Sequence, residues 1–211
     1  MRVLELFAGS RSIGKAAEAA GHEVISCDLE QFGDIDIVGD ILEIPISTYL
    51  PYNFECVWAS PPCTTFSVAS MGTHWDKDRL PKTDAALKGI RILEKTLAII
   101  KVINPKYYFI ENPRGMMRKM PEMLGLNRVT IWYCRYGDTR AKPTDIWSNN
   151  IANLFNQNGW LPRAECHNGN KKCHHEPAPR GSRTGTQGLK NNHERSKIPK
   201  KLCEEIIKSI T

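Results

Sequence analysis

The stretch that decides the fold lies at the start of the chain and reads Val3-Leu4-Glu5-Leu6-Phe7-Ala8-Gly9-Ser10-Arg11-Ser12-Ile13-Gly14. It begins with a short apolar strand, Val3–Leu6, and leads through a glycine turn into a helical pattern at Ile13–Ala20. Gly9 permits a tight turn and a close backbone approach, and the free amides at the start of the helix can bind a polar ligand. The stretch therefore predicts a strand–turn–helix unit of the kind that nucleotide-binding folds share.

Apolar strands and helical patterns alternate along the first two thirds of the chain. Further strands are expected at Val24–Cys27, Asp36–Val38, Cys56–Ala59, Tyr107–Glu111 and Val129–Cys134. A long helix is expected at Asp84–Val102, ended by Pro105, and a final amphipathic helix at Pro199–Ile210. This alternation predicts an α/β fold with a doubly wound, mostly parallel sheet, helices on both faces, and ligands beyond the carboxyl ends of the strands.

Charge and composition narrow the classes of partner. The chain has 211 residues and a formal net charge of +6, and its basic excess lies mainly in the second half. This asymmetry favours a partner that carries phosphate, although solubility alone can explain a mildly basic chain. There is no apolar run of about 18 residues and no signal-peptide pattern, and seven scattered cysteines suit a reducing compartment. We expect a soluble cytoplasmic protein with no membrane partner.

An acidic residue follows the second strand at the distance expected for a cofactor that contains ribose. Asp28 lies 19 positions after Gly9. A carboxylate about 20 residues beyond the glycine turn commonly accepts hydrogen bonds from a ribose hydroxyl. The two features together suggest an adenosine cofactor. The alternative is a helix-capping turn followed by an aspartate that caps a helix.

Two further clusters follow the fourth and fifth strands. In Ser60–Ser67 two prolines fix the backbone before Cys63, and a long loop to residue 83 follows. A cysteine placed there is a candidate nucleophile, although free cysteines are more often small buried hydrophobes. In Ile110–Gly115 the carboxyl group of Glu111 would approach Cys63 and could donate a proton, or it could form a turn and pair with Arg114.

Four motifs in this order resemble the DNA cytosine-C5 methyltransferases. They are Phe7-Ala8-Gly9, Pro61-Pro62-Cys63, Glu111-Asn112 and Thr139-Arg140-Ala141-Lys142. The resemblance covers roughly residues 1–150 well and the last 17 residues loosely. It implies a Rossmann-like methyltransferase fold that uses S-adenosylmethionine, DNA as the partner, a monomer, and the cytoplasm of a bacterial or phage-infected cell.

The resemblance also implies a role for individual residues. Cys63 would add to C6 of a cytosine flipped out of the duplex, Glu111 would hydrogen-bond N3 and the exocyclic amine, and Arg140 would hold the base or a flanking phosphate. The implied cofactor-binding residues are Phe7, Ala8, Gly9, Ser10, Asp28, Leu29, Asp40, Ile41, Pro61 and Ser196. The implied nucleic-acid contacts are Ser67, Lys142, Arg183 and Lys197.

The chain departs from the family in its arginine motif, its final motif and its length. Lys142 stands where the family has arginine, which loses a bidentate fork, and basic residues occupy the final motif around Lys197. We expect a catalytic and cofactor-binding domain at 1–150, a reduced basic insertion at 151–194 in place of a target-recognition domain, and a C-terminal helix at 195–211 that packs back on the catalytic domain. Such minimal members resemble those of bacteriophages, with low sequence specificity.

The insertion contains a group of cysteines and histidines. Cys166, His167, Cys173 and His174 are candidate ligands for a structural zinc ion that could organise a loop too short to build its own core. Their spacing matches no standard zinc finger, and histidines can equally face phosphate.

Three other functions stay open at this point. The same cysteine and glutamate serve in RNA cytosine-C5 methyltransferases. Basic residues near the final motif could pair with a carboxylated variant of the cofactor, which would transfer a modified group. An inactive DNA-binding homologue is the third, although a pure binder has no use for a thiol between prolines.

Overall fold

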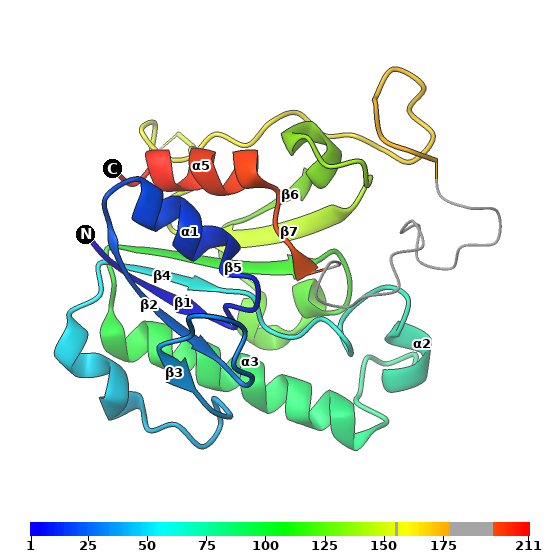
Figure 1. Ribbon diagram of the computed structural model, residues 1–211. Coiled ribbons are helices and arrows are strands. Elements are labelled where there is room, and N and C mark those ends of the chain that lie inside the picture. The colour runs from blue at the N-terminus through cyan, green and yellow to red at the C-terminus, as the bar shows by residue number, and fades with distance from the viewer. Residues whose placement is uncertain (155, 178–195) are drawn as a thin grey trace.

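The computed structural model describes residues 1–154, 156–177 and 196–211. Within these residues a single mixed sheet runs through the molecule in the order β3-β2-β1-β4-β5-β7-β6 (Figure 1). The strands are β1 (Arg2–Leu6), β2 (Glu23–Asp28), β3 (Ile37–Val38), β4 (Cys56–Ala59), β5 (Tyr107–Pro113), β6 (Arg128–Trp132) and β7 (Pro143–Ser148). The first five pair in parallel, and β7 runs antiparallel to both of its neighbours. The predicted α/β fold with a mostly parallel sheet is confirmed.

Helices cover both faces of the sheet. On one face α1 (Ser12–Ala19) packs beside α5 (Lys200–Lys208), which brings the C-terminal segment against the first helix (Figure 1). On the other face lie α3 (Asp84–Ile103) and the 3-10 helix η1 (Ile46–Tyr52). None of the described helices is long and apolar enough to cross a membrane.

Side chains that alternate along each strand build one core on each face. In β1, Leu4 and Leu6 join the core under α3, whereas Val3 joins the core under α1 and α5. This is the period of two expected for a strand buried on both faces. Both cores contain fully buried aromatic residues, among them Tyr49 on the α3 side and Trp58 on the α1 side. The sheet is therefore a rigid support for the loops at its edges.

The expected strand at Val129–Cys134 is too long, and the structure adds a strand that the sequence did not predict. β6 ends at Trp132, and the 3-10 helix η4 (Tyr133–Tyr136) follows. β7 escaped prediction because polar residues interrupt its apolar pattern, including the fully buried Asp145. That carboxylate is neutralised by Arg118 and Arg128, so the strand tolerates a charge that would otherwise be costly to bury.

The expected helices are present with small shifts of their ends. The helix expected at Ile13–Ala20 is α1, and the one expected at Asp84–Val102 is α3. The Thr83 side chain accepts a hydrogen bond from the Ala86 amide at 3.2 Å and caps the start of α3. The loop expected at residues 60–83 contains the short helix α2 (Met71–His74).

Candidate functional site

The strand register brings the predicted site residues to one edge of the sheet. Leu6 pairs with Cys27 on one side and with Ala59 on the other, and Ala59 pairs in turn with Ile110. The segments that follow β1, β2 and β4 therefore leave the same edge as the last residues of β5. Strand order reverses between β1 and β4, and the crevice at such a point is where ligands bind in doubly wound sheets.

The turn after β1 has an unusual backbone. Phe7, Gly9 and Arg11 all have positive φ, at 59°, 48° and 52°. This region favours glycine, and a non-glycine residue held there costs on the order of 1 kcal/mol or more. Strained backbone of this type is concentrated at ligand sites. Among the residues that the structure describes, only the Phe7 carbonyl oxygen, 4.0 Å away, lies near the position that a Cβ on Gly9 would occupy, so these residues leave the space above the glycine open.

The Asp28 carboxylate fixes this turn. Its Oδ2 accepts a hydrogen bond from the Gly9 amide at 2.8 Å, and its Oδ1 accepts one from Glu30 at 3.1 Å. The Ala8 amide donates to the Cys27 carbonyl at 3.0 Å. Asp28 thus ties the ends of β1 and β2 together, and each carboxylate oxygen retains a further lone pair that can accept from a ligand hydroxyl.

The residues after β3 differ in their exposure. Asp40 accepts hydrogen bonds from the Leu42 amide at 3.0 Å and from Lys88 at 2.9 Å, and both partners hold the pKa of Asp40 below its ordinary value. Ile41, by contrast, is buried in the core on the α3 side. Leu29, after β2, is 59% exposed, which leaves its side chain accessible to a ligand.

The strand that carries Glu111 and the residues just after it brace the Cys63 loop on both sides of the cysteine. Before it, Asn112 Nδ2 donates to the Pro61 carbonyl at 2.8 Å. After it, the Met116 amide donates to the Phe66 carbonyl at 2.6 Å. The Cys63 carbonyl itself accepts from the Phe66 and Ser67 amides at 3.2 and 3.0 Å. The thiol is therefore carried by a short, tightly hydrogen-bonded turn and is half-buried.

The close approach of these segments requires a glycine. Ser67 and Gly115 form an isolated antiparallel bridge. A Cβ on Gly115 would lie only 2.0 Å from the Phe66 carbonyl oxygen, which is a backbone atom. Any side chain at this position would push the Cys63 loop away from the end of β5.

Glu111 is nearly buried and is oriented by a tyrosine that sequence reasoning missed. The Tyr133 hydroxyl donates to Glu111 Oε1 at 2.9 Å. Burial raises the pKa of Tyr133 well above its ordinary value, and the neighbouring Glu111 charge raises it further, so the phenol remains a donor. The Lys142 ammonium lies over the Tyr133 ring at 4.6 Å. Nothing in the sequence around Tyr133 marks it, because it follows an apolar strand like many core residues.

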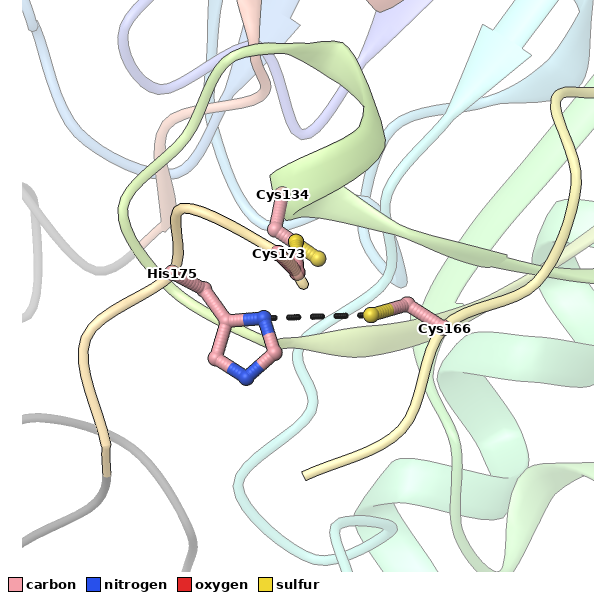
Figure 2. A group of neighbouring side chains, drawn as sticks. All are labelled: Cys134, Cys166, Cys173 and His175. Atoms are coloured by element: carbon pink, nitrogen blue, oxygen red, sulfur yellow. Dashed lines mark hydrogen bonds between the residues drawn. The ribbon is translucent and has the colours of Figure 1, made fainter. Parts of the chain in front are cut away.

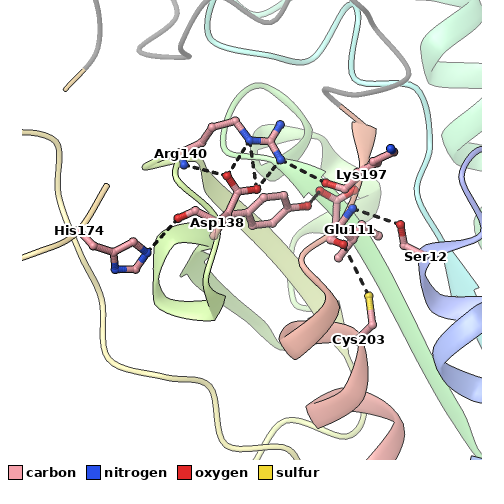
Figure 3. A network of polar contacts seen from close by, with 9 residues as sticks. Ser12, Glu111, Asp138, Arg140, His174, Lys197 and Cys203 are labelled. Carbon is pink, nitrogen blue, oxygen red and sulfur yellow. Dashed lines mark hydrogen bonds and ion pairs between the residues drawn. The ribbon is translucent and has the colours of Figure 1, made fainter. Parts of the chain in front are cut away.

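Arg140 is held by an ion pair with Asp138 (Figure 3). Its Nε lies 2.9 and 3.1 Å from the two carboxylate oxygens of Asp138, and a second guanidinium nitrogen also pairs with this group. Arg140 donates at 3.4 Å to the Lys197 carbonyl, and the Ile198 amide donates to Ser12 Oγ at 3.3 Å. The segment before α5 thus bridges the arginine loop and the start of α1. The side chains of Ser196 and Lys197 are exposed.

The cysteines and histidines of the insertion gather in a different set from the expected one. Cys166 and Cys173 lie together, but the other members are Cys134 of η4 and His175 (Figure 2). His167 and His174 lie outside the cluster, and His174 instead contacts the Asp138 carbonyl at 3.1 Å. No sequence spacing links Cys134 to the others, because the fold alone brings it there. Arg183 lies outside the described residues.

Comparison with known proteins agrees with this arrangement. A family model described as C-5 cytosine-specific DNA methylase matches residues 1–127. A curated protein of Frog virus 3 (isolate Goorha), "Probable DNA (cytosine-5)-methyltransferase", is 34% identical over 161 residues, which cover 71% of each chain.

A solved structure with the same fold is more distant in sequence. The Entamoeba histolytica methyltransferase EhMeth superposes with a TM-score of 0.54 at 16% identity over 79% of this chain, which spans only 57% of the length of EhMeth. The Dnmt2 methyltransferase of S. pombe gives a TM-score of 0.45 at 16% identity. The match covers 70% of this chain and 48% of the Dnmt2 chain.

Proposed function

The chain belongs to the C-5 cytosine-specific DNA methylase family, and we propose that it transfers a methyl group from S-adenosylmethionine to C5 of cytosine in DNA through a covalent bond to Cys63. The observation that carries the proposal is the double brace between β5 and the Cys63 loop. It ties the Cys63 loop to the end of the strand that carries Glu111, through Asn112 in the strand and Met116 just after it. Nucleophile and carboxyl group would then meet one base in a fixed geometry.

The residues at the crevice fit an adenosine cofactor. The Asp28 carboxylate offers acceptors for ribose hydroxyls, and the open space above Gly9 leaves room for a ligand against the backbone. Phe7, Ala8, Ser10, Leu29, Asp40, Pro61 and Ser196 are the remaining residues proposed to hold the cofactor. Ile41 would contribute through its backbone, because its side chain is buried. When bound, S-adenosylmethionine supplies an electrophilic methyl carbon on a sulfonium.

The chain's own residues account for the activation of the base. Cytosine C5 is a poor nucleophile until the Cys63 thiolate bonds to C6, which moves an electron pair toward C5. Glu111, held by Tyr133, would hydrogen-bond N3 and the exocyclic amine and stabilise the charge that develops on the ring. Bonding of C5 to the methyl carbon would break the methyl–sulfur bond, whose electron pair returns to the sulfur and leaves S-adenosylhomocysteine. The C5 proton would then pass to a base, the electrons of the C5–H bond would re-form the C5–C6 double bond, and Cys63 would depart from C6 as thiolate.

Arg140 and its neighbours would contact the nucleic acid. The Asp138 ion pair holds the guanidinium in one orientation, and Ser67, Lys142 and Lys197 would add phosphate contacts. The target atom cannot be reached in a stacked duplex, so the base must be flipped out. We expect low sequence specificity because the insertion is short. Its described residues, 151–154 and 156–177, form isolated bridges but contain no helix or strand.

Transfer of a labelled methyl group tests the proposal and identifies the nucleic acid. Purified protein is incubated with methyl-labelled S-adenosylmethionine and with duplex DNA, single-stranded DNA or RNA, and the nucleosides are identified by mass spectrometry. We expect 5-methyldeoxycytidine from DNA, and loss of more than about a hundredfold in Cys63→Ser with cofactor affinity within a few fold. Label in RNA alone would make the chain an RNA methyltransferase, and full activity of Cys63→Ser would exclude the covalent mechanism.

A further inference from the structure

Four side chains with metal-binding atoms converge beside the arginine loop. They come from two segments far apart in the sequence, Cys134 from η4 and Cys166, Cys173 and His175 from the insertion (Figure 2). One ligand atom of each lies within 4.8 Å of all the others. The Cys166 sulfur faces His175 Nδ1 at 3.8 Å. Figure 2 shows the three sulfur atoms and this ring nitrogen directed toward a common centre.

These distances suit a tetrahedral zinc ion. Zinc binds thiolate sulfur at about 2.3 Å and imidazole nitrogen at about 2.0 Å, so the sulfur–sulfur edges of its tetrahedron measure about 3.8 Å and the sulfur–nitrogen edges about 3.5 Å. The Cys166 Sγ–His175 Nδ1 separation of 3.8 Å is close to such an edge. Three sulfurs and one imidazole nitrogen form a soft ligand set that selects zinc over magnesium or calcium.

Burial argues that at least three of the four groups are not simply surface side chains. Cys134, Cys166 and His175 are 1%, 6% and 8% exposed, and Cys173 is partly buried. Thiols make only weak hydrogen bonds, so three of them packed around an imidazole gain little from one another. A disulfide could join two of the sulfurs but would leave the third thiol and His175 unused. A metal ion satisfies all four groups at once.

The surroundings supply the outer contacts that zinc thiolates commonly have. Asn170 Nδ2 donates to the Cys166 sulfur at 3.5 Å. The Cys173 amide donates to the Asn170 carbonyl at 3.0 Å, which closes a turn that presents both cysteines to the centre. Outer hydrogen bonds of this type orient ligands and balance the charge of thiolates.

We propose that Cys134, Cys166, Cys173 and His175 bind one structural Zn²⁺ ion. The part of the insertion that meets η4 needs such a support because the apolar cluster there is very small. It consists of Trp132, Cys134, Ala141 and Cys166, with Cys173 packed against it. Each thiol releases its proton on binding, and the metal links the insertion to η4 and so to the sheet.

The proposed centre also has a path to Arg140. The segment that holds Cys173 and His175 contacts the arginine loop twice, through His174 to the Asp138 carbonyl at 3.1 Å and from the Glu176 amide to the Thr139 carbonyl at 2.9 Å. Asp138 in turn holds the Arg140 guanidinium (Figure 3). The zinc ion therefore fixes the loop that presents Arg140, and this part of the inference rests on the proposed function.

Metal analysis of the untagged full-length chain tests the site without any measurement of activity. We expect about one zinc per chain by elemental mass spectrometry, and intense visible and near-ultraviolet cobalt–thiolate bands after Co²⁺ exchange. Cys134→Ala, Cys173→Ala and His175→Ala should each retain less than about a fifth of the zinc. Two control variants should keep the zinc. His167→Ala removes a histidine outside the cluster, and Cys203→Ala removes a buried cysteine on α5.

A ligand exchange separates metal binding from simple loss of packing. His175→Cys offers a fourth thiolate, so it should keep zinc and shift the cobalt spectrum, whereas His175→Ala loses the metal. Less than about a tenth of a zinc per chain in the wild type, even after anaerobic reconstitution with zinc and reductant, would overturn the site. Equal zinc in wild type and in all three alanine variants would also overturn it.

Hydrogen exchange tests the link to the arginine loop. Removal of zinc should speed exchange of the Glu176 amide, which donates to Thr139, while the Ala8 amide at the β1 turn stays protected. If the exchange rate of the Glu176 amide did not change on loss of the metal, the ion would support the insertion but not the arginine loop. Because neither readout involves methyl transfer, either can fail while the proposed methyltransferase activity stands.

Discussion

Glu5 lies in the middle of β1 with its carboxyl group buried at the first turn of α1. Its Oε1 accepts a hydrogen bond from the Ile13 amide at 3.1 Å, and a Cβ on Gly14 would come within 2.5 Å of its Oε2. Burial raises the pKa of Glu5 to about 7, although the helix amides and the charge of Arg11 oppose the shift. The glycine in the helix is thus explained by the carboxyl group beneath it.

This shift predicts how stability depends on pH. A carboxyl group whose folded pKa lies above its ordinary value of 4.5 favours the folded state at low pH, and this stability is lost as pH rises toward 7. We predict that Glu5→Gln, which cannot ionise, gains up to about 3 kcal/mol relative to wild type between pH 4.5 and pH 8. Urea unfolding of both proteins at several pH values measures the difference. A constant difference across this range would contradict the raised pKa.

The sequence marked some site residues at this scale and missed others. Cys63, Glu111 and Asp28 could be found because motifs and strand ends identify them. Tyr133 and Cys134 could not, because each follows an apolar strand and acquires its partner only when β7 joins β6 to β5 in the sheet and the insertion returns over η4. His175 was not among the expected ligands although it directly follows Cys173 and His174, and only the fold distinguishes it from His174.

At the scale of elements, the important feature is the contact between the segment just after β5 and the Cys63 loop. The Ser67–Gly115 bridge and the Met116–Phe66 hydrogen bond tie the loop to this segment. Cys63, the proposed nucleophile, is thereby supported from the end of a strand, which is more rigid than a free loop.

Gly115→Ala tests this contact. The new Cβ would meet the Phe66 carbonyl at 2.0 Å, so the loop must move, and we predict a loss of about 1–3 kcal/mol in stability with at least a tenfold loss of methyl transfer. Gly72→Ala, in α2 of the same loop with nothing within 4 Å of the new atom, is the matched control and should change neither. Chemical unfolding and methyl-transfer assays measure both. Wild-type activity of Gly115→Ala would show that the close approach is dispensable.

Local sequence predicted most elements but not β7, the strand that runs antiparallel to both of its neighbours. Periodicity and the Asn104–Pro105 stop identified α3, because these signals are local. β7 was missed because its buried Asp145 is neutralised by Arg118 and Arg128, which lie elsewhere in the sequence. A polar residue inside a strand can be interpreted correctly only when its distant partner is known.

At the scale of the whole molecule, basic charge is expected to guide nucleic acid to the carboxyl edge of the sheet. Lys197 is exposed beside the arginine loop, and its carbonyl accepts from Arg140. Lys208 is also exposed but lies near the other edge, because Thr211, just beyond α5, contacts His22 before β2 at 3.2 Å. The two lysines at opposite ends of one segment therefore allow a matched comparison.

We predict that Lys197→Ala weakens DNA binding to the same extent on unrelated sequences. It should also lower the slope of log affinity against log salt by about one, because one phosphate contact is lost. Lys208→Ala, which removes the same charge, should leave the slope unchanged. Fluorescence anisotropy across a range of salt concentrations measures both. Equal slopes for wild type and Lys197→Ala would remove Lys197 from the interface, and a sequence-dependent loss would contradict low specificity.

The covalent bond between Cys63 and cytosine C6 is tested most directly with DNA that contains 5-fluorocytosine. Once C5 carries both fluorine and the new methyl group, no proton can leave, so the C6–S bond cannot break and the complex should survive denaturation. We predict a one-to-one protein–DNA adduct that forms only with S-adenosylmethionine, carries the added methyl mass, and maps to the peptide containing Cys63. Methylation of ordinary cytosine without any adduct on fluorocytosine, or an adduct on another cysteine, would contradict the assignment of Cys63 as the nucleophile.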